Sequence, residues 1–358
     1  MKKSMIFLLK ALIGIAIIVV VYFVVSILYA MITDYKPEKM SIAEPLQAPS
    51  PVSGTEDVKD TLTLFSWNIG YAGLGKESDF FYDGGKMVRP AKHISQKNLS
   101  GILDQIAQFD AAHADFILLQ EVDICSKRSY HTNQWEKIAQ ILPQYNSSFG
   151  KNYDVKYIPI PPLEPMGKAL GGIITFYKAK PLSAPLRYSF PANFSFPKGL
   201  FFLDRCFTLQ RFAYGDKELV LINTHNSAYD GGTLKKEEMA YFHDYLTAEY
   251  AKGNYVIIGG DWNQIPPGYV PLLPAGESGY EETPIPQGYL PPEWTWAYDG
   301  STATNRKVDF PYQKGKTYTT VIDYFLLSPN IELIKVKGIA NGFEHSDHQP
   351  VWTQVRLK

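Results

Sequence analysis

Val256-Ile-Ile-Gly-Gly-Asp-Trp-Asn-Gln-Ile-Pro266 joins a short run of β-branched residues to two glycines and a polar turn. The apolar run predicts a buried strand over 256–258, and the glycines allow the backbone to pass closely beneath a ligand. Asp261 and Asn263 follow at the carboxyl end of that strand. Their carboxylate and carboxamide suit both a cation and a phosphoryl group. Taken alone, such a turn is also typical of ordinary loops.

The apolar pattern outside this stretch predicts many strands and few helices. Two strands flank Gly215-Asp216, which indicates a β-hairpin, and Thr233 can cap a helix that leads into the strand at 256–258. This number of strands, half alternating and half continuously apolar, favours two stacked sheets flanked by helices. The predicted strands cover residues 62–67, 116–119, 171–177, 207–212, 218–224, 256–258, 321–327, 332–336 and 350–357, and the predicted helices cover 98–113, 134–142 and 233–252.

Residues 1–33 predict a membrane anchor. They contain three lysines and no acid, and an uncharged run of 22 residues extends from Ala11 to Ile32. Such a run can cross roughly 30 Å of hydrocarbon. A cleaved signal peptide is the alternative, but its apolar region is usually shorter, and Ile27-Leu-Tyr-Ala30 matches its cleavage site poorly. Lysines before the span favour a cytoplasmic N-terminus, so we expect a single-pass membrane protein with the remaining chain outside the cytoplasm.

The composition of the chain is that of a globular protein, with 45% hydrophobic and 20% charged residues among 358. Residues 34–60 are polar and contain several prolines, which predicts a linker. One large domain is then expected over residues 61–358. Without residues 1–33, 32 Lys and Arg stand against 36 Asp and Glu. A nucleic-acid partner is therefore possible but not favoured, since no basic stripe is present.

The sequence leaves two further properties of the protein open. Cys125 and Cys206 could form a disulfide outside the cytoplasm, but nothing in the sequence shows that they meet. No feature of the sequence predicts an oligomeric state.

Polar residues end, or lie within, six of the predicted strand segments. Each is also typical of a structural group: Glu121 could be the first solvated residue of a loop, and His225 could be a hydrogen-bonded core histidine. Together on a strand-rich frame they predict one polar site at the strand ends. In chain order they are Trp67-Asn68, Gln120-Glu121, Asn223-Thr-His225-Asn226, Gly260-Asp-Trp-Asn263, Ile322-Asp323-Tyr324 and Ser346-Asp-His348.

These six motifs, in this order, resemble those of the endonuclease/exonuclease/phosphatase superfamily. The resemblance covers about residues 61–358. It implies an α/β fold, namely a four-layer α-β-β-α sandwich of two stacked and mostly antiparallel sheets, preceded here by a transmembrane helix. It also implies a metal-dependent phosphoric ester hydrolase whose site lies where both sheets present their strand ends.

The resemblance assigns a role to each motif residue. Glu121 is expected to be the main ligand of Mg2+, with Mn2+ as a possible substitute, and Asn68 and Asp347 are expected near that cation. The general base stays open between Asp261 and the His348–Asp323 pair, as does the number of metal ions. The expected catalytic residues are Asp261, which orients or deprotonates water; Asn263, which binds the phosphate; Asp323, which orients His348; and His225, which contacts the phosphate or the leaving oxygen.

Elementary chemistry agrees with these roles. A phosphodiester is anionic and repels hydroxide, so in-line attack needs a cation and hydrogen-bond donors on the phosphate oxygens. It also needs a base near the water and a proton or a metal near the departing oxygen. A carboxylate–imidazole pair can carry charge near neutral pH.

Four residues outside the catalytic set are predicted to contact the substrate: Arg128, Lys168, Asn226 and Arg306. An ordinary solvated loop is the alternative for the segment around Arg128. Six phenylalanines between Arg187 and Arg211 favour core packing over a lipid-facing rim.

The insert over about 264–320 is rich in proline and aromatic residues, including Trp294, Trp296 and Tyr298. It contains Thr304-Asn-Arg306, which predicts a cap over the cleft, and substrate specificity is expected to reside in this insert.

Four functions fit these observations. The first is a membrane-anchored, Mg2+-dependent phosphodiesterase acting on a lipid head group or small phosphoester, which the anchor, the acidic balance and the aromatic segments favour. The second is an exported DNA or RNA endonuclease, and the third is a phosphomonoesterase, which would share every motif. The fourth is a non-enzymatic binding protein on the same fold, which is disfavoured because no motif is missing.

Overall fold

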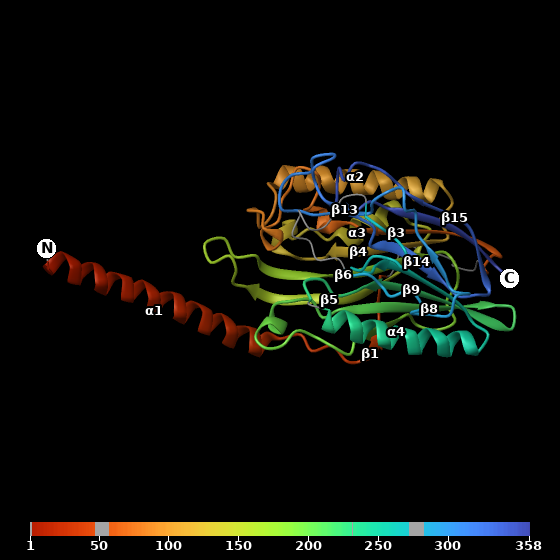
Figure 1. The fold of residues 1–358 in the computed structure, drawn as a ribbon, viewed down its shortest axis with the longest axis horizontal. Coiled ribbons are helices and arrows are strands. Elements are labelled where there is room, and N and C mark those ends of the chain that lie inside the picture. Colours follow the sequence, from red (N-terminus) through yellow and green to blue (C-terminus); the bar gives the residue numbers. More distant parts are fainter. Residues whose placement is uncertain (1, 47–56, 231, 272–282) are drawn as a thin grey trace.

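Two seven-stranded sheets stack face to face in the computed structural model, which describes residues 2–46, 57–230, 232–271 and 283–358 (Figure 1). Sheet I has the order β1 (Met40–Ile42), β7 (Leu186–Ser189), β8 (Cys206–Tyr214), β9 (Lys217–His225), β10 (Tyr255–Asp261), β14 (Asp323–Leu327) and β11 (Thr295–Ala297). Sheet II has the order β15 (Ile331–Gly338), β16 (Val351–Leu357), β3 (Thr61–Asn68), β4 (Phe116–Asp123), β6 (Gly167–Tyr177), β5 (Asn146–Ile158) and β2 (Glu44–Leu46).

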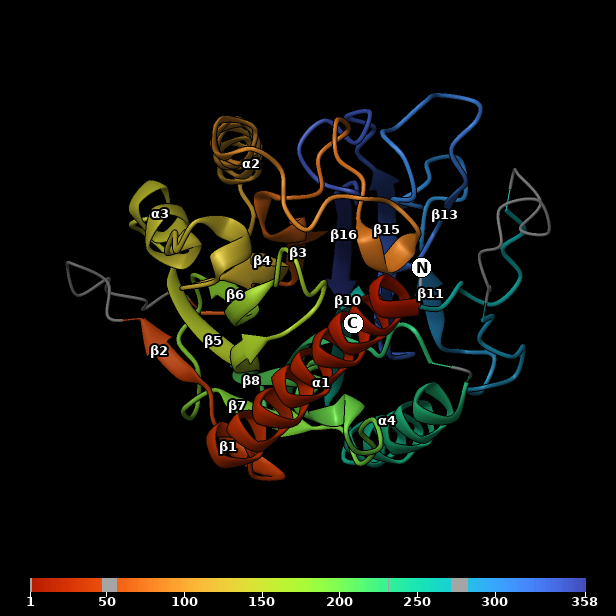
Figure 2. The same ribbon diagram turned by 90° about the vertical axis from the view of Figure 1, so that its left-hand side faces the viewer.

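Helices cover the outer faces of both sheets, which confirms the predicted α-β-β-α sandwich (Figure 2). α2 (Lys92–Ala111) and α3 (Gln134–Ile141) pack on sheet II, where Ile102 joins the same core as Ile117. α4 (Thr233–Ala251) packs on sheet I, where Phe242 joins the same core as Ile258.

Side chains of alternating direction fill the space between the sheets. Leu118 of β4 and Ile257 of β10 belong to this inner core, whereas their neighbours Ile117 and Ile258 face the helices. A strand between two cores has no solvated face, and this explains why the sequence at 256–258 is continuously apolar. Each fully buried leucine or isoleucine there stabilises the fold by about 1.5–3 kcal/mol.

Neighbouring strands are antiparallel except for two pairs, one in each sheet. β3 runs parallel to β4, and β9 runs parallel to β10. The carboxyl ends of these strands therefore lie together at one edge of the sandwich. Asn68 pairs with Gln120 there, and Asp261 pairs with His225.

The segment predicted as a linker is partly built into the sandwich, so that prediction is wrong for residues 40–46. β1 pairs with β7 of sheet I, β2 pairs with β5 of sheet II, and Ala43 between them is buried. Short strands that add to sheet edges carry little hydrophobic pattern, which is why proline and polar composition alone predicted a tether. Residues 47–56 lie outside the described part of the chain.

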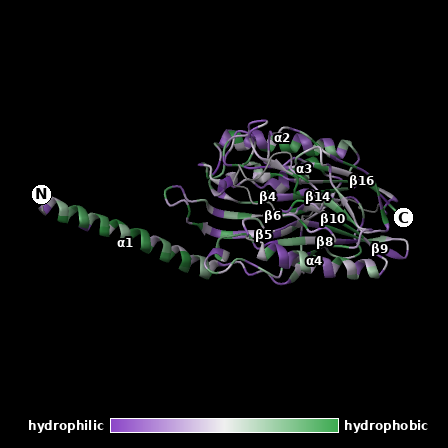
Figure 3. Cartoon of the chain, in the orientation of Figure 1, coloured by the Kyte–Doolittle hydropathy of each residue, from purple (hydrophilic) through white to green (hydrophobic). Residues whose placement is uncertain are grey.

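One long apolar helix, α1 (Lys2–Thr33), projects from the sandwich (Figure 1, Figure 3). It is the one helix among the described residues that is long and apolar enough to cross a membrane, a test that a signal sequence also passes.

The insert contributes more to the core than to a cap. β11 adds to the edge of sheet I, and Trp294 and Trp296 pack in the core beneath α4. The later part of the insert does reach the cleft, through Asn305 and Arg306. Residues 272–282 of the insert lie outside the described ranges.

The glycines of the 256–266 stretch serve the packing of the strands rather than the approach of a ligand. At Gly260, with φ of 148°, a Cβ atom would lie 2.0 Å from the carbonyl oxygen of Thr224. At Gly259, a Cβ atom would overlap the ring of Phe325.

We expect Gly260→Ala to lower the free energy of unfolding by about 3 kcal/mol, because the added methyl group overlaps backbone in a left-handed conformation. Gly300→Ala is the matched control, since its Cβ would meet no atom closer than 3.7 Å. Urea denaturation followed by circular dichroism measures both. Equal stability of the two variants would contradict the packing role of Gly260.

Candidate active site

The eight predicted catalytic and metal-binding residues gather at the edge where the parallel strands end. Asp261 is the centre of the hydrogen-bond network. Its Oδ2 accepts from Nδ2 of Asn68 at 2.9 Å and lies 3.4 Å from Nε2 of His225. Its Oδ1 accepts from the backbone N–H of Asn263 at 2.9 Å, so the carboxylate is held from both sides.

A β-bulge aims Glu121 at the same place. The pairing of β4 with β6 shifts register between Leu119 and Val122, and Glu121 adopts a φ of 53°. This conformation is costly for a residue with a side chain and is frequent at functional sites. The Glu121 carboxylate lies 3.4 Å from Nδ2 of Asn68 and 3.9 Å from Nε2 of His225.

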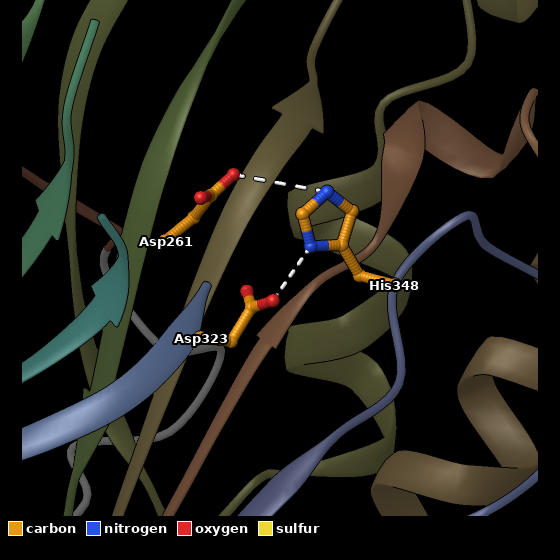
Figure 4. Close-up of side chains that lie close together, drawn as sticks. All are labelled: Asp261, Asp323 and His348. Atoms are coloured by element: carbon orange, nitrogen blue, oxygen red, sulfur yellow. Dashed lines mark hydrogen bonds and ion pairs between the residues drawn. The ribbon is translucent and has the colours of Figure 1, made fainter. Parts of the chain in front are cut away.

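His348 and Asp323 form a buried carboxylate–imidazole pair, with 2.8 Å between Nδ1 and Oδ2 (Figure 4). Nε2 of His348 lies 2.9 Å from the amide of Asn305 and 3.8 Å from Oδ2 of Asp261. Burial alone would lower the pKa of His348, but Asp323, Asp261 and Asp347 outweigh it and raise that pKa to about 10. The three carboxylates therefore favour the protonated form of the ring.

The pKa of His225 is shifted in the opposite direction. Burial lowers its pKa well below the ordinary value of 6.5, and the positive charges of Arg205, His348 and Arg128 lower it further. A neutral imidazole carries one N–H, which here can be directed from Nε2 to an oxygen. Nδ1 of His225 is buried and has no hydrogen-bond partner among the described residues.

The residues predicted to hold a cation are placed as a set of hard oxygen ligands. Ser346 donates to the carbonyl of Asn68 at 2.8 Å and brings Asp347 beside β3. Burial and the neighbouring charge of Glu121 contribute to raising the pKa of Asp347 to about 7. Two carboxylates crowded in this way suit a divalent cation, which would favour the ionised form of Asp347. The Asn68 amide lies beside them, with Nδ2 toward Glu121.

Asp261, Asp323 and His348 form a second group whose potential ligand atoms lie within 4.8 Å of one another. In that group Nδ1 of His348 is already engaged by Asp323. Hydrogen bonding therefore accounts for its geometry, and Glu121, Asp347 and Asn68 stay the predicted cation ligands.

A cavity of about 490 Å³ opens over this network, a size that suits a small ligand. Its lining combines both signs of charge with an aromatic wall. The acidic members are Asp83, Glu121, Asp230, Asp261 and Asp347, the basic members are Arg128, Arg205, Lys235, Arg306 and Lys307, and the aromatic members include Tyr71, Phe80, Tyr82, Tyr153, Phe194, Phe201, Phe202 and Tyr229.

Two of the four predicted substrate contacts line the cavity, but their guanidinium groups already have hydrogen-bond partners within the protein. Arg128 forms a two-bond pair with Asp123, at 3.0 Å for both bonds, and lies over the ring of Tyr71. Arg306 donates through Nη2 to three carbonyl groups, those of residues 74, 75 and 78, at 2.8–3.1 Å.

Lys168 and Asn226 do not line the cavity. Nζ of Lys168 contacts Sγ of Cys125 at 3.5 Å. Asn226 is buried and accepts from the hydroxyl of Thr224 at 2.6 Å. Both predictions relied on proximity in sequence to a motif, whereas neighbouring strand residues point to opposite faces. Cys125 and Cys206 are both free thiols.

Arg205, Lys235 and Asn305 are cavity residues that the sequence analysis missed. Nη1 of Arg205 is buried and has no hydrogen-bond partner among the described residues. Nothing in the sequence around Arg205 marks it, because it comes just before a strand and not after one. The stretch Thr304-Asn-Arg306 contains Asn305, but a substrate contact was predicted only for Arg306.

A four-layer sandwich whose strand ends gather carboxylates, amides and two histidines defines a metal-dependent phosphoric ester hydrolase. The chain belongs to the endonuclease/exonuclease/phosphatase family, whose family model matches residues 65–348. Members of this family are nucleases, phosphatases and phosphodiesterases.

Solved structures of low sequence identity share the fold. An endonuclease/exonuclease/phosphatase from Beutenbergia cavernae is 17% identical with a TM-score of 0.56, and the match covers 84% of this chain and 72% of that one. D. rerio TDP2 complexed with single-strand DNA product is 15% identical with a TM-score of 0.51, over 84% and 100%. ANGEL2, a 2',3'-cyclic phosphatase, is 17% identical with a TM-score of 0.50, over 83% and 95%. No curated protein matches the sequence.

We expect Asp323→Asn to lower the pKa of His348 from about 10, because the largest of the charges that raise it is removed while burial stays. Because the pKa of His348 is raised in the folded state, its pairing with Asp323 stabilises the fold fully below pH 6.5. This stabilisation is lost as the pH rises towards 10. NMR titration of the histidine ring protons in chelator, assigned with His348→Gln, measures the shift. An unchanged pKa in the Asp323 variant would contradict the ion pair.

Proposed function

We propose that this protein is a membrane-anchored, Mg2+-dependent phosphodiesterase that acts outside the cytoplasm on a lipid head group or another small phosphoester. The observation that carries this proposal is the convergence of Glu121, Asp261 and His348 on one cavity, where aromatic side chains form much of the wall. The apolar helix α1 supports the anchoring.

Glu121, Asp347 and the side-chain oxygen of Asn68 would hold the cation. When bound, a divalent cation neutralises phosphate charge and lowers the pKa of a bound water. The oxygen of Asn68 already accepts from the backbone N–H of Gly70 at 3.0 Å, which leaves its second lone pair for an ion.

Asp261 is the better candidate for the general base. Three carboxylates outweigh burial and favour the protonated form of His348, and that form cannot accept a proton. Asp261 accepts the proton of the attacking water as the new bond from water oxygen to phosphorus forms. The bond from phosphorus to the leaving oxygen breaks, and His348 transfers its proton to that oxygen.

Arg205 would complete the phosphate site. Arg205 and His225 both line the cavity, and the positive charge of Arg205 contributes to lowering the pKa of His225. A buried N–H without a partner is costly until an anion satisfies it. The neutral His225 can donate from Nε2 to a second phosphate oxygen.

The size of the cavity and the balance of acidic and basic side chains in its lining favour a compact head group over a nucleic-acid backbone. Five acidic side chains line it beside five basic ones, whereas nucleic-acid sites usually present an excess of positive charge. A nuclease or a phosphomonoesterase remains the alternative that the substrate panel below decides.

We expect phosphate or head-group release from phospholipids and from bis-p-nitrophenyl phosphate with Mg2+, and none with chelator. Asp261→Asn and His348→Gln should each reduce kcat by about 10²–10⁴-fold, because each removes a group engaged in proton transfer. His243→Gln, a half-exposed histidine of α4, is the control and should keep full activity. Cleavage of DNA or RNA alone would contradict the lipid preference.

We expect Arg205→Gln to lower kcat/KM for phosphodiesters by about 10–100-fold, the loss of one charge-assisted hydrogen bond. Arg356→Gln is the matched control, because that side chain is 55% exposed and pairs with Glu332 on the surface. Steady-state kinetics measures both variants. Equal kcat/KM values would remove Arg205 from the phosphate site.

A further inference from the structure

The last three turns of α1 pack against the catalytic domain instead of standing free. Residues four apart form the contact face: Tyr22 is half-buried, and Ser26 and Ala30 are buried. The Tyr22 hydroxyl donates to the carbonyl of Pro159 at 2.9 Å and accepts from the hydroxyl of Tyr157 at 2.9 Å. Because β1 and β2 tie the following residues into both sheets, the helix is fixed to the domain at both ends of this contact.

This contact sets the height of the domain above a bilayer. If the span begins after Lys3, the stretch to Tyr22 rises about 28 Å, which equals the hydrocarbon thickness and puts Tyr22 at the outer surface. If it begins after Lys10, Tyr22 stands about 18 Å along and lies within the hydrocarbon. On either count the part of the domain that contacts Tyr22 lies at the outer surface or below it.

That part is the hairpin that joins β5 to β6, and its tip is apolar. Residues 159–165 read Pro-Ile-Pro-Pro-Leu-Glu-Pro, with Glu164 as the one charge. Leu163 is fully exposed, and the hairpin projects from the domain on the same side as α1 (Figure 1). A lone exposed leucine needs no explanation in general, but a proline-stiffened tip held beside a hydrophobic helix fits a bilayer interface.

The active-site cavity lies at this end of the molecule, because β4 ends beside the start of β6. Met166 at the base of the hairpin lines it, and so does Phe194. A second cavity, between the segment after α1 and the loop at 190–205, shares Phe194 and Arg205 with the first. Phe196 of that loop is 67% exposed, and the adjoining 3-10 turn (Lys198–Leu200) contacts α1.

We propose that the β5–β6 tip around Leu163 lies in the interface of the bilayer that α1 crosses, so that the catalytic cavity faces the surface of the outer leaflet. This inference rests on the membrane anchoring in the proposed function. The tip and α1 are then two contacts with one bilayer, and they fix the orientation of the cavity. A substrate phosphodiester carried by a lipid of that leaflet enters without leaving the membrane.

Fluorescence quenching in vesicles tests this orientation. The full chain is reconstituted in phosphatidylcholine vesicles with Cys125→Ser, since the other cysteine, Cys206, is fully buried. Leu163→Cys carries a nitrobenzoxadiazole label, and the vesicles contain lipids with a nitroxide near the head group. Leu182→Cys is the matched control, because Leu182 is 53% exposed and follows the far end of β6.

We expect the label at position 163 to lose most of its fluorescence to the nitroxide lipids and the label at position 182 to keep it. No quenching at 163, or equal quenching at both positions, would overturn the proposal. Phosphodiesterase activity is measured on the same vesicles and separates the two claims. Activity without quenching of the label at position 163 would contradict only the membrane orientation. Quenching of that label without activity would contradict only the proposed function.

Discussion

The side chain of Asn223 fixes the two halves of the active site relative to each other. Asn223 belongs to sheet I, yet its amide donates to the carbonyl of Ile174 in sheet II at 2.9 Å and accepts from Nε2 of Gln120 at 2.8 Å. Gln120 precedes Glu121, and Asn223 stands two residues before His225. A fully buried polar link in an apolar layer tolerates little displacement. It therefore sets the distance between the cation ligand on one sheet and the histidine on the other.

The charges of the site are balanced only in part by the protein itself. Asp261, Asp323 and Asp347 lie around one imidazolium, and Glu121 adds a further carboxylate nearby. Buried carboxylates repel one another, which destabilises the ionised forms unless a cation is present. The strained backbone of Glu121 is a second local cost at the same place. Sites that violate the rules of stable packing in this way are usually the functional ones.

The sequence was sufficient for the fold and for most of the site, because both follow from local patterns. Apolar runs located the strands, and polar residues at their ends located Asn68, Asp261 and His348. Long-range contacts were not readable in this way. The orientation of the Glu121 side chain depends on a β-bulge in the pairing of β4 with β6. The cavity position of Arg205 depends on the path of an irregular loop. The linker prediction failed at β1 and β2 because pairing at a sheet edge needs only three residues each.

Anomalous scattering from a crystal of the chain grown with Mn2+ tests most directly whether these groups converge on one cation. The account predicts a single strong peak within about 2.5 Å of a Glu121 carboxylate oxygen, with Asn68 and Asp347 around it. A peak between Asp261, Asp323 and His348, or no peak near Glu121 at saturating Mn2+, would contradict it.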